Sequence, residues 1–366
     1  MASIAIDQNV IATTEGCRYC LMCRHVCPVT RVTYNEATSP HGWALTIASV
    51  RRGLLEWNAE TADLLYQCAD CGLCQANCAT DQPLPYAIVA ARAEVVAAGR
   101  APAAVAELDA ALRQGLSAGA AGQAQPAEVA LFCGAAPAQE QQASLGAARS
   151  LLEHVGMSHA AVAAGRESGY LAYTLGLHET ARDLALATVD EIRRLGCRTL
   201  LTMSPEQAHA LKHLYPLLGA PLPEQVEVVE LTGLLAALLD EGRLKLRPAE
   251  LDAAYHDPCQ TARLEGRGQA PRRLLAALAG QPPREGFWRE RRATSCGASG
   301  GLPWTQPRLA AAMAAAALAD STRDGARVVV TEAPGCLAHL RANAPDGLEV
   351  RGLYELLAEQ VLSAEF

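Results

Sequence analysis

The sequence has few aromatic residues, almost no lysine and no long apolar run. Phe, Trp and Tyr make up 4% of the 366 residues, and lysine occurs only as Lys212 and Lys245. The net charge is −8 and no basic tail or lysine-rich run is present, which argues against a nucleic-acid partner. The longest apolar segments, 231–239 and 309–318, fall well short of the ~20 residues that span a bilayer. We therefore expect cores built from Ala, Leu and Val.

The sequence also lacks a secretion signal, and its cysteines are not spaced as in a disulfide-bonded protein. The first ten residues, MASIAIDQNV, have neither the positive nor the apolar region of a signal peptide. Many of the 13 cysteines stand in C-x2-C spacing, which in a chain of this length indicates metal or cluster ligands. Thiols that bind iron need a reducing compartment. We expect a cytoplasmic protein whose membrane association, where it occurs, is made through a partner.

Two copies of one cysteine pattern, C-x2-C-x2-C-x3-C, lie in the first quarter of the chain. The first copy is Cys17, Cys20, Cys23 and Cys27, and the second is Cys68, Cys71, Cys74 and Cys78. This is the ligand run of two-cluster [4Fe–4S] ferredoxins, in which the last cysteine of each run binds the other cluster. The resulting assignment is Cys17, Cys20, Cys23 and Cys78 for cluster 1, and Cys68, Cys71, Cys74 and Cys27 for cluster 2. A pair of zinc sites is the alternative, but this repeated run is a poor zinc pattern.

The chain divides into four segments. Residues 1–100 are predicted to form an α-helical ferredoxin domain, because a helical pattern from His41 to Trp57 separates the two cysteine runs. This insert resembles the α-helical ferredoxin domain of respiratory iron–sulfur subunits. Residues 101–126 are predicted to form a helix followed by a linker. Residues 127–245 and 246–366 alternate strands and helices, which predicts two tandem α/β repeats with parallel sheets, and an α+β multidomain fold overall.

The sequences of the two α/β segments can be aligned with each other by residue class. The predicted strands 129–132, 199–202 and 226–229 correspond to 253–255, 328–331 and 348–350. The stretch 166–169 likewise corresponds to 294–297, and the spacings agree within two residues. We therefore expect two copies of one structural unit.

The second repeat resembles the cysteine-rich CCG domains of the heterodisulfide reductase family. That family includes the iron–sulfur subunits of glycolate oxidase and of anaerobic glycerol-3-phosphate dehydrogenase. The matching stretches are 256–259, 295–301 and 333–337. A full repeat of this family offers five cysteines, and three remain here: Cys259, Cys296 and Cys336. Ser295 and Ala333 stand where the family has the other two.

The first repeat departs further from the family pattern. Of its cysteine positions only Cys133 remains, and the others are occupied by Glu167, Ser168, Ser204 and Gln207. We expect it to bind no cluster and to act as a scaffold. For the second repeat three interpretations stay open: a third iron–sulfur cluster, a zinc ion bound together with His256 as a Cys3His set, or no metal.

Electron transfer is the function that the resemblance implies. No flavin or nucleotide fingerprint is present, so two-electron chemistry on a substrate belongs to a partner. We expect a non-catalytic subunit that carries electrons between a flavoprotein dehydrogenase and a quinone or another carrier, with a quinone-reducing or membrane subunit as a further partner. The alternatives are a heterodisulfide-reductase-like enzyme with its active cluster at Cys259, Cys296 and Cys336, and a scaffold protein with vestigial metal sites.

Overall fold

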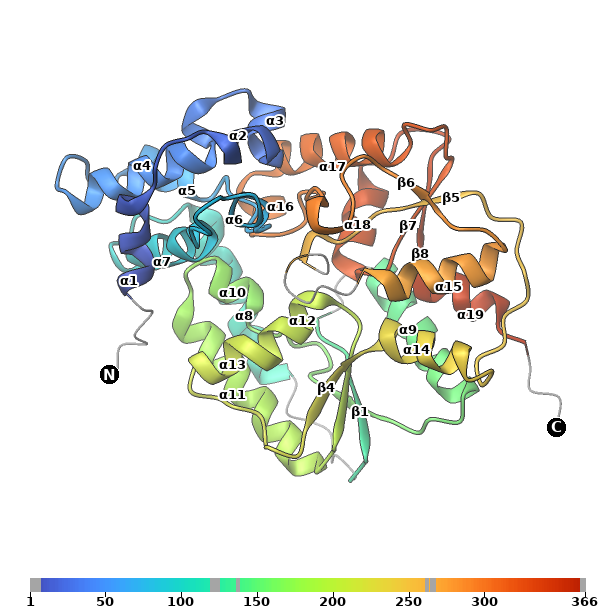
Figure 1. Ribbon diagram of the computed structural model, residues 1–366. Coiled ribbons are helices and arrows are strands. Elements are labelled where there is room, and N and C mark those ends of the chain that lie inside the picture. Colours follow the sequence, from blue (N-terminus) through green and yellow to red (C-terminus); the bar gives the residue numbers. More distant parts are fainter. Residues whose placement is uncertain (1–7, 119–125, 136–138, 261–262, 264–267, 363–366) are drawn as a thin grey trace.

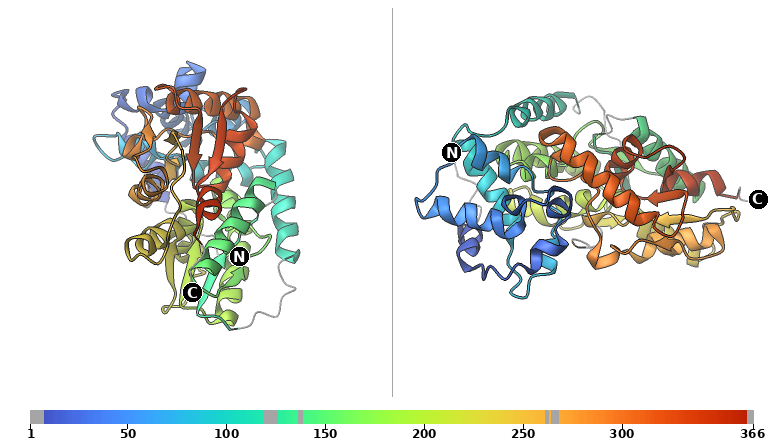
Figure 2. Two further views of the ribbon diagram at one scale, coloured as in Figure 1. Left: turned by 90° about the vertical axis from the view of Figure 1, so that its right-hand side faces the viewer. Right: turned by 90° about the horizontal axis from the view of Figure 1, so that it is seen from above.

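A helical module and two α/β repeats make up the protein in the computed structural model (Figure 1). The structure describes residues 8–118, 126–135, 139–260, 263 and 268–362. Seen from above, the helical module lies at one end of the molecule and the second repeat extends to the other (Figure 2). The predicted α+β fold with a helical ferredoxin-like region followed by parallel sheets is confirmed.

The helical module is a set of short helices joined by cysteine-bearing loops. Its helices are α1 (Gln8–Ala12), α2 (Met22–Val26), α3 (Pro28–Thr33), α4 (Pro40–Arg51), α5 (Ala59–Leu65), α6 (Leu73–Ala76), α7 (Leu84–Ala97) and α8 (Ala103–Ala118). Helix α4 begins where the Ser39 side chain accepts a hydrogen bond from the Gly42 N–H. It ends earlier than the predicted Trp57, because Gly53 adopts a left-handed conformation that stops the helix.

The first repeat contains a four-stranded parallel sheet in the order β2-β1-β3-β4. Its strands are β1 (Val129–Phe132), β2 (Ala160–Val162), β3 (Thr199–Thr202) and β4 (Glu227–Glu230). Its helices are α9 (Gln139–His154), α10 (Tyr170–Thr174), α11 (His178–Leu195), α12 (Pro205–His209), α13 (Tyr215–Leu217) and α14 (Leu231–Asp240). A π-helical turn, Ala210–Leu214, connects α12 to α13, so this helical segment is irregular.

The second repeat has the same sheet order, β6-β5-β7-β8, also with parallel strands. Its strands are β5 (Ala253–Tyr255), β6 (Arg284–Glu285), β7 (Val328–Thr331) and β8 (Glu349–Gly352). Its helices are α15 (Gln269–Ala279), α16 (Leu302–Thr305), α17 (Pro307–Ser321), α18 (Pro334–Ala342) and α19 (Leu353–Gln360). The two sheets have corresponding strand orders, as expected for two copies of one structural unit. The edge strands β2 and β6 were not predicted, because two or three residues carry too little apolar pattern.

Two glycines mark the same point in both repeats. Gly169 has φ 91° and Gly297 has φ 92°, a region that favours glycine. A Cβ atom would meet the Ala181 carbonyl oxygen at 2.9 Å in the first repeat and the Ala310 carbonyl oxygen at 2.6 Å in the second. Both turns therefore pass directly over a helix backbone, which supports the predicted correspondence of 166–169 with 294–297.

The two repeats share one hydrophobic core. Helix α9 packs on α19, and α14 packs on α15, so apolar side chains of both repeats meet between the sheets. The buried Tyr354 hydroxyl of the second repeat donates to the Met203 carbonyl oxygen of the first, at 3.1 Å. The helical module joins this body through α17, which packs on α3, and through α8, which packs on α11.

Candidate iron–sulfur and metal sites

The two cysteine loops of the helical module have matching backbone conformations. Tyr19 and Asp70, each two residues after the first cysteine of its run, have φ 50° and 49°. Their backbone N–H groups donate to the Sγ atoms of Cys17 and Cys68, at 3.5 and 3.4 Å. Left-handed conformations are rare outside glycine and often mark functional sites. Each loop therefore folds so that one backbone N–H group points at the first cysteine sulfur, a contact that would also stabilise a negatively charged cluster.

The four cysteines predicted for cluster 1 lie together. Cys17, Cys20, Cys23 and Cys78 line one cavity of about 270 Å³ between the first loop and the end of the second. Burial, together with the neighbouring Cys17, raises the pKa of Cys23 to about 11. The cavity is apolar and surrounded by sulfur, so the residues present fit a [4Fe–4S] cube.

The four cysteines predicted for cluster 2 also lie together. Cys27, Cys68, Cys71 and Cys74 surround a smaller hollow beside Pro28 and Trp43. Burial, reinforced by Cys71, raises the pKa of Cys27 to about 12, and burial raises the pKa of Cys74 well above the ordinary thiol value. Thiolates bind metal, so bound iron would offset the desolvation that otherwise keeps these groups protonated. Which cluster each cysteine binds stays a prediction.

A third group of ligand atoms lies at the carboxyl ends of β5 and β7. One ligand atom from each of His256, Cys296 and Cys336 lies within 4.8 Å of the others, and the two Sγ atoms are 3.4 Å apart. Contact with the Cys336 thiol, and then with His256, holds the pKa of Cys296 well below its ordinary value. Two thiolates on one zinc ion lie about 3.8 Å apart when each Zn–S bond is about 2.3 Å. Thiolates on different irons of a cube point to separate corners and lie further apart than this thiol contact.

Cys259 lies beside this group and faces the helical module. Its side chain is buried, and burial raises its pKa to about 12. Its Sγ atom is 4.0 Å from the Ser299 Oγ atom, which in turn donates to the Ala69 carbonyl oxygen at 2.7 Å. The loop of the third group is thus fastened to the loop between Cys68 and Cys71.

In the first repeat, Cys133 and the residues at the lost cysteine positions are also brought together. They line a cavity of about 120 Å³ at the carboxyl ends of β1 and β3: Cys133, Glu167, Ser168, Ser204 and Gln207. Burial raises the pKa of Glu167. The positions that the sequence correspondence aligns therefore lie together in the fold, with oxygen-bearing side chains at most of them.

Sequence reasoning missed Arg92, on the inner face of α7. Its side chain is fully buried and donates to the backbone carbonyl oxygens of all three parts of the protein. The acceptors are Leu65 and Cys68 of the helical module, Thr174 of the first repeat and Gly300 of the second. The available signal was the single positive charge within the mostly apolar stretch Ala87–Val95, which is unusual for a buried helix.

Comparison with known proteins finds a family match in the helical module and another in the second repeat. A family model described as "4Fe-4S dicluster domain" matches residues 13–81, and one described as "CCG: Cysteine-rich domain" matches residues 253–341. The first match contains all eight cysteines of the two runs, and the second contains the His256, Cys296 and Cys336 group. No helix among the described residues is both long and apolar enough to cross a membrane.

Individual relatives agree with this domain content. A "Probable membrane-anchored ferredoxin" of Chromohalobacter salexigens is 30% identical over 54% of this chain and 30% of its own length. One component of the dihydromethanophenazine:CoB--CoM heterodisulfide reductase of Methanosarcina barkeri is 31% identical over 50% of this chain and 45% of its own. The chain therefore spans less than half the length of these curated relatives.

One solved structure has a similar fold. The crystal structure of a hypothetical protein from Helicobacter pylori superimposes with a TM-score of 0.61 over 88% of this chain and 67% of that chain, at 11% identity. At this identity the likeness shows the fold alone. The chain itself is an iron–sulfur protein that combines a 4Fe-4S dicluster domain with a CCG cysteine-rich domain.

Proposed function

We propose that the chain is a non-catalytic electron-transfer subunit that carries electrons between a flavin-dependent dehydrogenase and a quinone or another carrier. The observation that carries this proposal is the convergence of two complete sets of four cysteines within one module. Two adjacent clusters transfer electrons one at a time, and no group in the sequence supplies flavin or nicotinamide chemistry. We place the subunit in the cytoplasm, where a partner links it to the membrane.

The two cysteine sets are ordered from the surface to the interior, and this order supports the proposed electron transfer. Cys20 of the first set is exposed, whereas Cys27 and Cys68 of the second set are buried. The loop after Cys68 then contacts the Ser299 loop beside Cys259. Electrons entering at the exposed loop would therefore pass inward, toward the junction with the two repeats.

An apolar surface surrounds the exposed entry point. Among the described residues, eight of the twelve exposed large apolar side chains belong to the helical module. Three of them flank Cys20: Tyr19, Leu21 and Met22, with exposed fractions of 39%, 38% and 49%. Exposed apolar patches commonly mark protein contacts. We propose that the flavoprotein partner docks on this loop, with its flavin near cluster 1.

Anaerobic affinity purification tests the partner. We expect the tagged chain to recover a flavoprotein, and Leu21→Glu combined with Met22→Glu to reduce the recovered flavin at least tenfold, because two charges then lie in an apolar contact. Leu217→Glu is the matched control, since Leu217 is 72% exposed on the first repeat. Recovery of the chain without flavin, or equal recovery with all variants, would contradict this partner.

For the second repeat we propose a single zinc ion bound by His256, Cys296 and Cys336. The 3.4 Å separation of the two Sγ atoms supports one ion over a third cube, and mixed nitrogen and sulfur ligands suit zinc. Cys259 is the nearest candidate for the fourth ligand. Zinc does not change its redox state, so this site would hold the junction loops in place. Electron transfer would then take place only through the two clusters of the helical module.

Metal analysis of anaerobically purified protein tests this assignment. We expect about eight irons and about one zinc per chain, and we expect Cys296→Ala to lose the zinc while it keeps the iron. Cys197→Ala is the control, because Cys197 is a fully buried cysteine of the first repeat outside all three groups. About twelve irons in the unsubstituted protein, falling to about eight in Cys296→Ala, would show a third cluster and sink the zinc proposal.

A further inference from the structure

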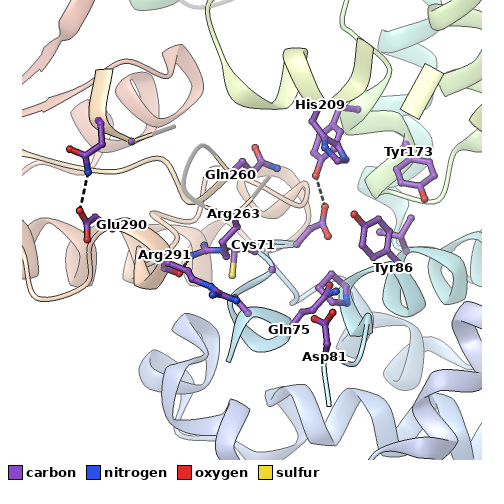
Figure 3. A pocket seen from close by; sticks show the side chains of 18 residues that line it. Cys71, Gln75, Asp81, Tyr86, Tyr173, His209, Gln260, Arg263, Glu290 and Arg291 are labelled. Atoms are coloured by element: carbon purple, nitrogen blue, oxygen red, sulfur yellow. Dashed lines mark hydrogen bonds between the residues drawn. The ribbon is translucent and has the colours of Figure 1, made fainter. Parts of the chain in front are cut away.

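A deep cavity of the described structure lies where the helical module meets both repeats. Its volume is about 570 Å³, within the usual range for small-molecule sites. Cys71, a proposed cluster 2 ligand, forms part of its wall (Figure 3). A molecule held in this cavity would therefore lie next to the inner end of the proposed electron path.

Hydrogen-bond donors line opposite sides of the cavity. On one side lie Tyr86 and Tyr173, and on the other lie Gln260, Arg263 and Arg291 (Figure 3). No hydrogen-bond partner of the Tyr86 or Tyr173 hydroxyl is found in the part of the chain that the structure describes. Burial raises the pKa of both hydroxyls, so they remain donors at neutral pH. A ligand that fits both sides carries an acceptor oxygen at each end.

Gln260 brings a buried polar group to the wall of this cavity. The residue is only 7% exposed at the cavity wall, and its Nε2 atom has no hydrogen-bond partner among the residues that the structure describes. A buried amide without a partner is unfavourable, and natural structures keep such groups mainly for function. Turning this amide toward the cavity breaks no hydrogen bond of Nε2, so it can meet an entering acceptor.

The charges of the lining favour an uncharged ligand. Two guanidinium groups, Arg263 and Arg291, stand against three carboxyl groups, Asp70, Asp81 and Glu290. With cluster 2 adding negative charge beside Cys71, a carboxylate or phosphate would be repelled rather than held. The aromatic rings of Tyr86 and Tyr173 also offer a surface against which a flat ring can pack.

We propose that this cavity binds the headgroup of a para-quinone, with one carbonyl oxygen toward Tyr86 and Tyr173 and the other toward Gln260 and Arg263. The inference rests on the proposed electron-transfer function and names the carrier of that function. The quinone takes up two electrons, one from each reduced cluster, and two protons from water, and leaves as the quinol.

Stopped-flow oxidation of the reduced, cluster-loaded full chain tests the site. The probe is 2,3-dimethoxy-5-methyl-1,4-benzoquinone, a soluble headgroup without a tail, and the readout is the visible absorbance of the clusters. We expect the rate to saturate with quinone concentration. Gln260→Leu and Tyr86→Phe should each raise the half-saturating concentration about three- to tenfold, because each removes one donor. Gln114→Leu and Tyr34→Phe, at exposed positions outside the cavity, should leave it unchanged.

The outcomes separate this inference from the proposed function. The melting temperature of Gln260→Leu is measured alongside, and weaker binding at an unchanged melting temperature would not reflect misfolding. A rate that rises linearly with quinone and is equal in all variants, while ferricyanide oxidises the clusters normally, would overturn the quinone site alone. Saturation by a small disulfide but not by the quinone would overturn it as well. A chain that assembles no reducible cluster would overturn both proposals.

Discussion

Replacing Cys27 with alanine is expected to halve the iron content, from about eight to about four per chain, and to remove the cluster of the second run. Cys27 belongs to the first run in sequence, but in space it lies with Cys68, Cys71 and Cys74. Cys71 contributes to the raised pKa of Cys27, and Cys27 contributes to the raised pKa of Cys74, so these thiols lie near one another. Iron and acid-labile sulfide analysis, together with EPR of the dithionite-reduced protein, measures the loss.

Two double variants identify which cluster Cys27 serves. If the ligands are crossed, Cys27→Ala with Cys71→Ala damages one cluster twice and leaves about four irons. Cys27→Ala with Cys20→Ala then damages both clusters and leaves about none. Ligation within each run predicts the reverse pattern. Cys197→Ala is again the control and should keep all the iron, since Cys197 lies in the core of the first repeat.

The cysteine ligand loops and the central strands of both repeats were predictable because they depend on short stretches of sequence. A C-x2-C-x2-C-x3-C run specifies a loop geometry by itself, and strands such as β3 and β7 are apolar runs that pair within parallel sheets. The same holds for the third group, in which His256 and Cys259 follow β5, and Cys336 follows β7. Because carboxyl ends of parallel strands meet at one edge, these residues come together in the fold.

What the sequence did not predict depends on contacts between distant segments. The edge strands β2 and β6 are strands only because a neighbour pairs with them. The cavity beside Cys71 combines residues from all three parts of the protein, which no local pattern links. The acceptors of Arg92 are likewise spread from Leu65 to Gly300, so its role became visible only once the three parts were placed together.

Arg92 is a buried cation without an ion-pair partner among the described residues. Its guanidinium makes five hydrogen bonds, all to carbonyl oxygens, and lies 4.9 Å from the centre of the Tyr66 ring. Burying such a charge is unfavourable unless a negative charge lies near. The positive charge of Arg92 acts on Cys68, where it lowers a thiol pKa that burial raises. Arg92 acts in the same way on the buried Asp70 carboxyl, and a bound cluster 2 would add further negative charge beside it.

Arg92→Met is expected to lower the midpoint potential of cluster 2. A nearby positive charge stabilises the reduced form, which carries one more negative charge, so removing it makes reduction harder. Unit charges about 8 Å apart interact by about 2 kcal/mol at an effective dielectric constant of 20. That corresponds to a fall of roughly 90 mV for a one-electron couple, at about 59 mV per tenfold change. An EPR-monitored redox titration measures the shift.

Arg92→Lys separates the charge from the hydrogen bonds. Lysine keeps the positive charge but cannot donate to carbonyl oxygens of three separate segments in the fixed geometry of a guanidinium. Both variants should melt at a lower temperature, because carbonyl groups left without a donor cost about 1–3 kcal/mol each. The potential should fall only in Arg92→Met. An unchanged potential in Arg92→Met, with full iron content, would mean that Arg92 joins the three parts of the protein without tuning cluster 2.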